Sequence, residues 1–178
     1  TWRKYLDEQY ANGIWNTNAC PIVIRYAEVL LTYAEAVNEL SGPSADVYDK
    51  LDLIRGRVGM PKVDREKYAS KETLRRLIRR ERGVELAGEG VRRADILRWK
   101  DDNGKMVAET VLNGVLERVV GTVNYAETDP TKRAEIDTNA PATDKKIEDR
   151  VFKVHNRYNP IPQGAIDNNP NLEQNPGY

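Results

Sequence analysis

The most regular hydrophobic pattern in the chain lies between Ile22 and Leu40. Apolar or small residues recur there every three or four positions, which places them on one face of an amphipathic helix. They are Val23, Tyr26, Ala27, Leu30, Tyr33, Ala34, Val37 and Leu40. We therefore predict a helix over residues 22–40.

A second helix is expected directly after the break Ser41-Gly42-Pro43, because Gly commonly ends helices and Pro cannot continue one. Ser44 has a side chain suited to cap the N-terminus of that helix. An apolar stripe then follows at Val47, Tyr48, Leu51, Ile54 and Val58. Residues 22–58 are predicted to form an antiparallel helical hairpin of the size found in helical repeats.

Further helical segments are predicted before residue 100. After the break Gly59-Met60-Pro61, helical spacing resumes near Ser70, and another segment runs from Val91 to Trp99. Trp99 is expected to be a core residue at that helix end. Residues 1–100 are thus predicted to form a helical core.

The rest of the chain is more polar. We predict a surface insertion over residues 101–150, in which only Val107–Val120 has the spacing of an amphipathic helix. Residues 150–154 alternate briefly like a strand, and residues 159–178 contain three Asn-Pro pairs, which disfavour helix. Residues 151–178 are therefore predicted to be a short strand and an extended tail rich in Pro and Asn.

Charged side chains are densest between residues 77 and 99. Glu81 and Glu85 lie four positions apart and continue the apolar stripe of the predicted helix, so they should be partly buried. Buried carboxylates need partners, and arginine supplies paired hydrogen bonds. We predict a structural salt-bridge network formed by Glu81, Glu85, Arg82, Arg92, Arg93, Asp95 and Arg98.

The two glutamates also permit a different interpretation, as the general acid and base of a glycoside hydrolase. In such enzymes two carboxylates lie about 5 to 9 Å apart across the sugar bond. Neighbouring arginines would keep both groups ionised, whereas a general acid needs a raised pKa in an apolar pocket. We therefore expect no catalytic residue in this chain.

Composition excludes several other classes of protein. Lys plus Arg and Asp plus Glu number 28 each, so there is no net field to attract nucleic acid or an anionic membrane surface. Cys20 and His155 are the single residues of their types, which leaves no disulfide framework and no Cys/His zinc site. Gly88-Glu89-Gly90 lacks the features of a phosphate-binding loop, and we expect no cofactor or metal. No apolar run approaches the roughly 18 residues of a membrane span.

Aromatic residues near the start of the chain are the candidates for ligand binding. Sugar rings stack on Trp and Tyr, while their hydroxyls bond to Asn, Asp and Gln. Trp2 and Trp15 lie in a polar stretch that also contains Tyr5, Tyr10 and several asparagines. Because the stretch lacks periodicity, its tryptophans could instead pack it onto another part of the protein.

Three blocks of the sequence resemble the C-terminal part of SusD/RagB proteins. They read PIVIRYAEVLLTYAEAVNEL at 21–40, LIRRERGVELAGEGVRRADILRW at 77–99 and NPIPQGAIDNNPNLEQNPGY at 159–178. The resemblance implies a mainly α fold, with a tetratricopeptide-like helical hairpin and an irregular C-terminal region. Gly88 stands where the family more often has a bulky apolar residue, so helix packing is expected to differ there.

The same resemblance implies a function. SusD/RagB proteins are outer-membrane lipoproteins that act as a lid on a SusC-type TonB-dependent transporter and capture oligosaccharides or other nutrients without catalysis. The lipid anchor is expected in an upstream part of the same protein, with which this chain would associate. The family has no fixed ligand motif, so no further binding residue is carried over. A tetratricopeptide-like adaptor that binds peptides is the alternative.

Overall fold

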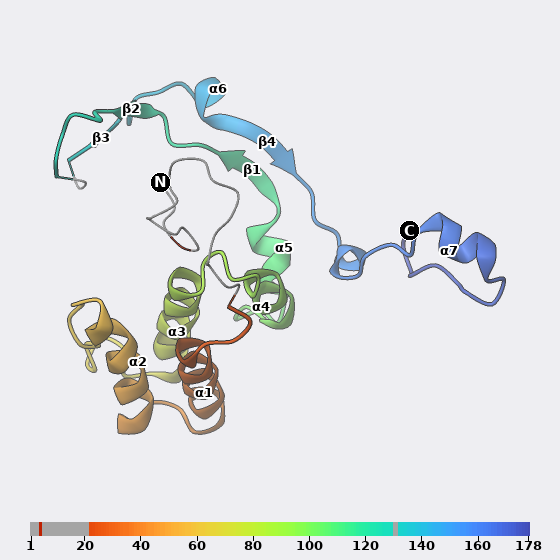
Figure 1. Ribbon diagram of the computed structural model, residues 1–178. Coiled ribbons are helices and arrows are strands. Elements are labelled where there is room, and N and C mark those ends of the chain that lie inside the picture. The colour runs from red at the N-terminus through yellow and green to blue at the C-terminus, as the bar shows by residue number, and fades with distance from the viewer. Residues whose placement is uncertain (1–3, 5–21, 130–131) are drawn as a thin grey trace. The chain divides into compact units, whose positions relative to one another are not determined.

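The computed structural model describes residue 4 and residues 22–129 and 132–178 (Figure 1). The chain divides into two compact units, Thr1–Arg93 and Ala94–Tyr178. Helices dominate the described residues, and the few strands are short. The predicted mainly α fold class is confirmed.

The first unit begins with the predicted helical hairpin. Helix α1 (Tyr26–Ser41) ends at Gly42, whose φ of +79° favours glycine and whose N–H donates to the Asn38 carbonyl at 2.9 Å. Helix α2 (Ala45–Arg57) begins after Ser44, whose hydroxyl accepts a hydrogen bond from the Val47 N–H at 3.3 Å. The two helices lie side by side in Figure 1.

Helix α3 (Lys71–Glu85) packs against α1. Its N-terminus is capped by Ser70, which exchanges hydrogen bonds with Thr73 through side chains and backbone. The three helices enclose one hydrophobic core, and each helix contributes one apolar stripe to it. Its buried members are Leu30, Leu31, Ala34, Val47, Tyr48, Leu51, Ile54, Val63, Leu74, Leu77, Ile78 and Leu86.

The second unit begins within α4 (Arg92–Arg98) and has a smaller core. Trp99 is 3% exposed and packs with Ile96 and with Ala108 of the short helix α5 (Val107–Val111). The Val107 N–H donates to the Trp99 carbonyl at 2.9 Å, which holds α5 beside the tryptophan. The prediction that Trp99 is a core residue is confirmed.

The amphipathic helix predicted over Val107–Val120 is wrong beyond Val111. The Asn113 side chain forms two hydrogen bonds with the backbone of Phe152. It accepts one from the Phe152 N–H at 2.6 Å and donates the other to the Phe152 carbonyl at 3.0 Å. Gly114 follows with a φ of +98°, and the chain then enters a strand. Contacts between residues distant in sequence therefore outweigh the local helical spacing.

The described part of residues 101–150 contains two antiparallel strand pairs. Strand β1 (Gly114–Glu117) pairs with β4 (Lys146–Arg150), and β2 (Gly121–Val123) pairs with β3 (Ala134–Ile136). The one-turn helix α6 (Ala142–Lys145) leads into β4. These strands are almost entirely exposed in this chain.

The strand predicted over residues 150–154 is also misplaced. The ladder ends where Arg150 pairs with Gly114, and the next hydrogen bonds of the chain go to the Asn113 side chain. Residues Val154–Arg157 form a 3-10 helix instead.

The prediction of an extended tail is wrong in part, because helix α7 (Gln163–Asn168) lies within it. Proline disfavours helix at its own position and just before it, and the Asn-Pro pairs flank these six residues rather than interrupt them. The tail also closes on itself. The Gln174 side chain accepts from the Ile161 N–H at 2.8 Å and donates to its carbonyl at 2.9 Å, and the Tyr178 hydroxyl donates to the Tyr158 carbonyl at 2.8 Å.

Candidate functional site

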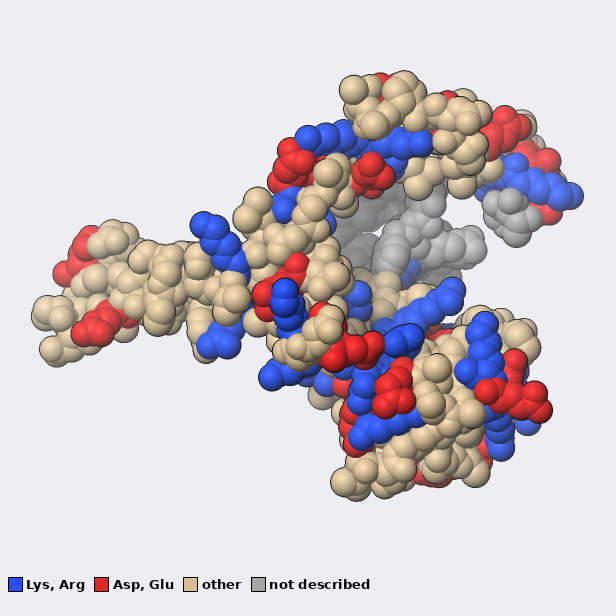
Figure 2. Space-filling view, turned by 180° about the vertical axis from the view of Figure 1, so that it is seen from behind, with Lys and Arg blue, Asp and Glu red and all other residues tan. Residues whose placement is uncertain are grey.

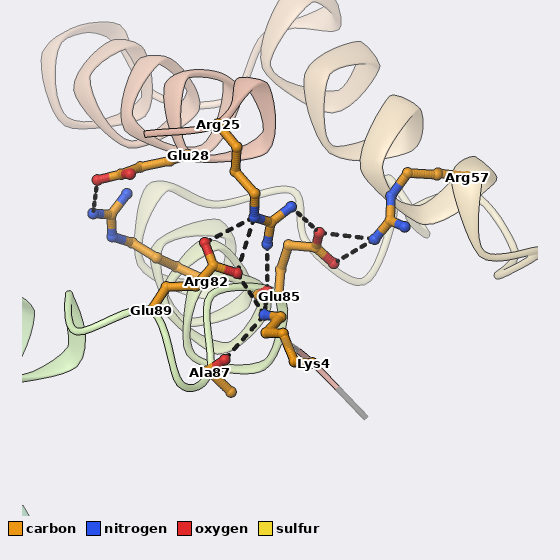
Figure 3. Close-up of polar contacts among 8 residues, drawn as sticks. All are labelled: Lys4, Arg25, Glu28, Arg57, Arg82, Glu85, Ala87 and Glu89. Atoms are coloured by element: carbon orange, nitrogen blue, oxygen red, sulfur yellow. Dashed lines mark hydrogen bonds and ion pairs between the residues drawn. The ribbon is translucent and has the colours of Figure 1, made fainter. Parts of the chain in front are cut away.

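Several of the charged residues singled out in the sequence lie on helix α3, in the first unit. Glu85 lies in the last turn of α3, and its carboxylate receives hydrogen bonds from Arg25 at 2.6 Å and from Arg57 at 2.8 and 3.1 Å (Figure 3). Glu81, one turn earlier, is bound by Arg55 of α2. Both glutamates are therefore held by arginines from other helices or their caps.

Glu89 follows α3 and is more buried than Glu81 and Glu85, with a side chain only 5% exposed against 14% and 13%. Arg25 Nε lies 2.9 and 2.8 Å from its two oxygens, and Lys4 Nζ lies 2.5 Å from Oε1. Burial alone would raise the pKa of the Glu89 carboxyl, but the hydrogen bonds from Arg25 and Lys4 outweigh it and lower the pKa below its ordinary value. Glu89 is thus a paired anion at neutral pH.

The same two cations also cover the C-terminal end of α3. Lys4 Nζ donates to the carbonyls of Glu85 at 2.8 Å and Ala87 at 2.9 Å, and Arg25 donates to the Glu85 carbonyl at 2.5 Å. The last carbonyls of a helix have no partner within the helix and carry partial negative charge. Since Arg25 is the N-cap residue of α1, one guanidinium joins the start of α1 to the end of α3. The hydrogen bond to Glu89 raises the pKa of Arg25 above its usual range.

Further ion pairs join α1 and α3. Arg82 is 6% exposed, lies 3.7 Å from the Glu28 carboxylate and donates to the Thr32 hydroxyl at 2.9 Å. At the other end of the helix pair, Arg75 donates to both oxygens of Glu39 at 2.5 and 2.6 Å. These hydrogen bonds lower the pKa of Glu39. In these pairs α1 supplies the acids and α3 the bases, whereas Arg25 at the start of α1 binds the acid Glu85 of α3, so the charges favour one alignment of the two helices.

The other members of the predicted network lie in and beside α4 (Arg92–Arg98). Asp95 is buried and pairs with Arg98 at 2.9 Å, three positions along α4 in the second unit. Arg92 lies against α3, where a Cβ added at Gly83 would be 3.4 Å from its guanidinium. Arg93 is exposed. Trp2 and Trp15 fall outside the described residues.

Sequence reasoning missed the central members of the cluster, which are Lys4, Arg25, Arg55, Arg57 and Glu89. One signal was present in the sequence. Glu89 stands between Gly88 and Gly90, which adopt φ values of +77° and +81° and form a tight bend that favours glycine. An acid fixed in such a bend after a helix end is a candidate for binding cations.

On the face seen in Figure 2, basic and acidic side chains are interspersed over the helices. Within the described residues, no group of His, Cys, Asp and Glu is arranged to hold a metal ion. None of the described helices is long and apolar enough to cross a membrane. A depression is lined by Arg55, Met60, Tyr68, Leu77, Arg80, Glu81 and Val84.

Comparison with known proteins then decides the family. The model of the SusD family matches residues 1–178. The chain belongs to the SusD family. The resemblance seen in the three sequence blocks is confirmed.

Relatives of the SusD family share both sequence and fold with this chain. The SusD-like protein P25 of Formosa agariphila is 40% identical over 79 residues, which cover 44% of this chain and 15% of that protein. The SusD-like protein P2 of the same species is 38% identical over 93 residues, covering 49% and 18%. The crystal structure of the SusD-like protein BF3747 from Bacteroides fragilis matches with a TM-score of 0.65 at 28% identity, over 89% of this chain and 26% of that one.

A second solved structure, named BT4246, has a TM-score of 0.66 at 25% identity and covers 91% of this chain and 25% of its own. The chain therefore spans about a quarter of the solved SusD relatives that it matches, and its alignments cover less than a fifth of the curated ones.

Proposed function

We propose that the full-length protein is a non-enzymatic binding subunit for glycans or related nutrients, and that these 178 residues mainly form its scaffold. The observation that carries the proposal is the match of the SusD family model to the whole chain. Membership of that family favours a surface lipoprotein of the outer membrane, anchored by a lipid elsewhere in the polypeptide. Its partner would be a SusC-type transporter that depends on TonB.

The charge cluster around α3 supports a scaffold role for this chain. The carboxylates of Glu81, Glu85 and Glu89 are engaged by arginine or lysine side chains from other segments. Charge-assisted hydrogen bonds of this kind hold helices in a fixed alignment and leave the oxygens little capacity for a ligand. Sugar contacts would then come from aromatic residues, with Trp2 and Trp15 as the candidates in this chain.

The same contacts disfavour hydrolysis. A glycosidase needs one carboxylic acid that donates a proton to the leaving oxygen and a second carboxylate that acts as base or nucleophile. Arg25 and Arg57 bind the Glu85 carboxylate, and Arg55 binds that of Glu81. Neither group is free to approach a sugar bond without breaking an ion pair.

The function is tested with the full-length protein and a panel of oligosaccharides, by calorimetric titration and by analysis of the products. We expect saturable binding of at least one oligosaccharide, unchanged chain lengths after incubation, and the same affinity in the Glu85→Gln variant. Shortened products that disappear in Glu81→Gln or Glu85→Gln would contradict the proposal.

The candidate sugar platform has its own test. Trp2→Ala and Trp15→Ala should each weaken binding of the same oligosaccharide about tenfold or more, since one stacked ring contributes on the order of 1 kcal/mol beyond its area. Tyr125→Ala is the matched control, because Tyr125 is 86% exposed and lies in another part of the chain. Equal affinities for all three variants would assign the two tryptophans to packing.

The proposed partner is tested by purifying the tagged full-length protein from outer membranes in mild detergent. A TonB-dependent transporter should copurify in a fixed ratio. Recovery of the protein without any transporter, while it remains lipid-anchored in the membrane fraction, would contradict that part of the proposal.

A further inference from the structure

Asn103 and Asn113 are the two asparagines among the described residues that are followed by glycine, and both lie in the second unit. Asparagine before glycine is chemically labile, because glycine has no side chain to keep its backbone nitrogen away from the asparagine amide. Both asparagines are exposed, and Gly104 and Gly114 both have positive φ values, +79° and +98°. Neither exposure nor the sign of φ therefore distinguishes the two sites.

The Asn113 side chain is held by three hydrogen bonds. Its oxygen accepts from the Phe152 N–H at 2.6 Å, and its nitrogen donates to the carbonyls of Phe152 at 3.0 Å and Glu109 at 2.7 Å. Phe152 in turn packs against the core around Trp99. The Asn113 amide must break these bonds before it can turn toward the Gly114 nitrogen.

The Asn103 side chain has no such restraint. Within the described part of the chain it has no hydrogen-bond partner, because only its backbone N–H is bonded, to the Asp101 carboxylate at 2.9 Å. It stands in an exposed turn, where the Gly104 N–H donates to the Asp101 carbonyl at 3.0 Å. Water can replace a single exposed bond of this kind at little cost. A local change of the turn is therefore enough to bring the Asn103 amide to the Gly104 nitrogen.

We propose that Asn103 is a site of spontaneous deamidation and that its hydrogen bonds protect Asn113 from the same reaction. The Gly104 backbone nitrogen attacks Cγ of Asn103, and the bond from Cγ to Nδ2 breaks. The proton of the Gly104 N–H passes through solvent to the leaving nitrogen, which departs as ammonia and leaves a cyclic imide. Water then adds to one of the two imide carbonyls and opens the ring, which gives aspartate or isoaspartate.

The isoaspartate product would reach the smaller core. It carries one additional carbon in the main chain, inside the turn that closes the antiparallel bridge between Lys100 and Met106. Next to this bridge, the Val107 N–H donates to the Trp99 carbonyl, and Met106 packs against the same core. A longer main chain at residue 103 should therefore loosen the start of α5.

The site is tested in the full-length protein, incubated in mildly alkaline buffer made with heavy-oxygen water and then mapped by peptide mass spectrometry. The heavy oxygen marks the groups that were modified during the incubation. In the native protein Asn103 should be modified about tenfold or more faster than Asn113, since the Asn113 amide must first be released. In urea the two rates should converge. Equal rates in the native protein, or the same ratio in urea as in the native protein, would overturn the proposal.

The effect on the core has a second readout, amide exchange at Val107. Exchange should be several-fold faster in the aged protein that contains isoaspartate than in the Asn103→Asp variant, which has the new charge but a main chain of normal length. Asn103→Gln is the control, because its longer side chain disfavours the cyclic imide, and ageing should leave its exchange slow. Faster exchange in the aged Asn103→Gln variant, or equal exchange in isoaspartate and Asn103→Asp proteins, would overturn the link to the core.

Discussion

Arg25 and Glu89, 64 positions apart in the sequence, share two hydrogen bonds of 2.9 and 2.8 Å. Arg25 also binds the carboxylate and the backbone carbonyl of Glu85. One guanidinium therefore joins the first residue before α1 to the last residue of α3 and to the bend that follows it (Figure 3). The predictions below test what this arrangement and the other long-range contacts contribute to the fold.

Replacing Glu85 by alanine should destabilise the protein by about 3 kcal/mol. The change removes the carboxylate that pairs with Arg25 and Arg57, and the Glu85 side chain is only 13% exposed. The measurement is urea unfolding followed by circular dichroism. Glu148→Ala is the control, since its pair with Arg150 is exposed and should contribute less than about 1 kcal/mol. An unchanged midpoint for Glu85→Ala would refute the structural role.

The stability should depend on pH through Glu89 and Glu39, whose pKa values are lowered in the folded protein. Their contribution to the free energy of unfolding is fully present above the ordinary carboxyl pKa of 4.5. It is lost as the pH falls further, because the unfolded chain then binds protons before the folded one does. Urea unfolding between pH 7 and pH 3 should show this loss, and it should be smaller in Glu89→Gln. Stability that rises on acidification, or the same decrease in the variant, would contradict the assignment.

Gly121→Ala should disrupt the β2–β3 pair, because a Cβ at this position would lie 2.2 Å from the Glu135 carbonyl oxygen. Gly56 in α2 is the matched control, since a Cβ there meets nothing within 4 Å. Gly56→Ala should stabilise the helix by about 0.5 to 1 kcal/mol. Amide exchange at Thr122 and Val123 should accelerate in the Gly121 variant alone. Slow exchange in both variants would show that the strands can adapt.

Gln174→Ala should open the C-terminal tail, because the Gln174 amide binds both the N–H and the carbonyl of Ile161. Limited proteolysis measures the opening, and cleavage within residues 161–174 should become several-fold faster. Gln163→Ala is the matched control, because the exposed Gln163 side chain bonds to Asp167 within its own helix. Equal cleavage rates for both variants would mean that the tail is closed by other contacts.

The helices that the sequence predicted best are those whose period and caps agree. The apolar stripe of α1 stops just before Gly42, where the helix ends, and the stripe of α2 starts just after its cap Ser44. Helix α3 begins after Ser70, where the helical spacing resumes. Such features depend on local geometry, and local geometry can be inferred from a single sequence.

The features that were missed depend on partners far away in the chain. The spacing of Val107–Val120 suggests a helix, but Asn113 binds Phe152, and Gly114 pairs with Arg150. Likewise, the sequence indicated that Glu81 and Glu85 need cations but could not choose between nearby and distant arginines, and the structure places Arg25, Arg55 and Arg57 beside them. Pairing of this kind is set by tertiary packing, which propensity and spacing do not contain.

The central claim is that the full-length protein binds glycans without cleaving them and that these 178 residues serve mainly as scaffold. The most direct test titrates the full-length protein and the 178-residue chain side by side with the same oligosaccharides, after cooperative unfolding has shown that both are folded. We predict saturable binding without products for the full-length protein and no binding by the shorter chain, since Trp2 and Trp15 would supply only part of a platform. Equal affinity of the two would place the binding site within this chain, and cleavage by either would contradict the non-enzymatic function.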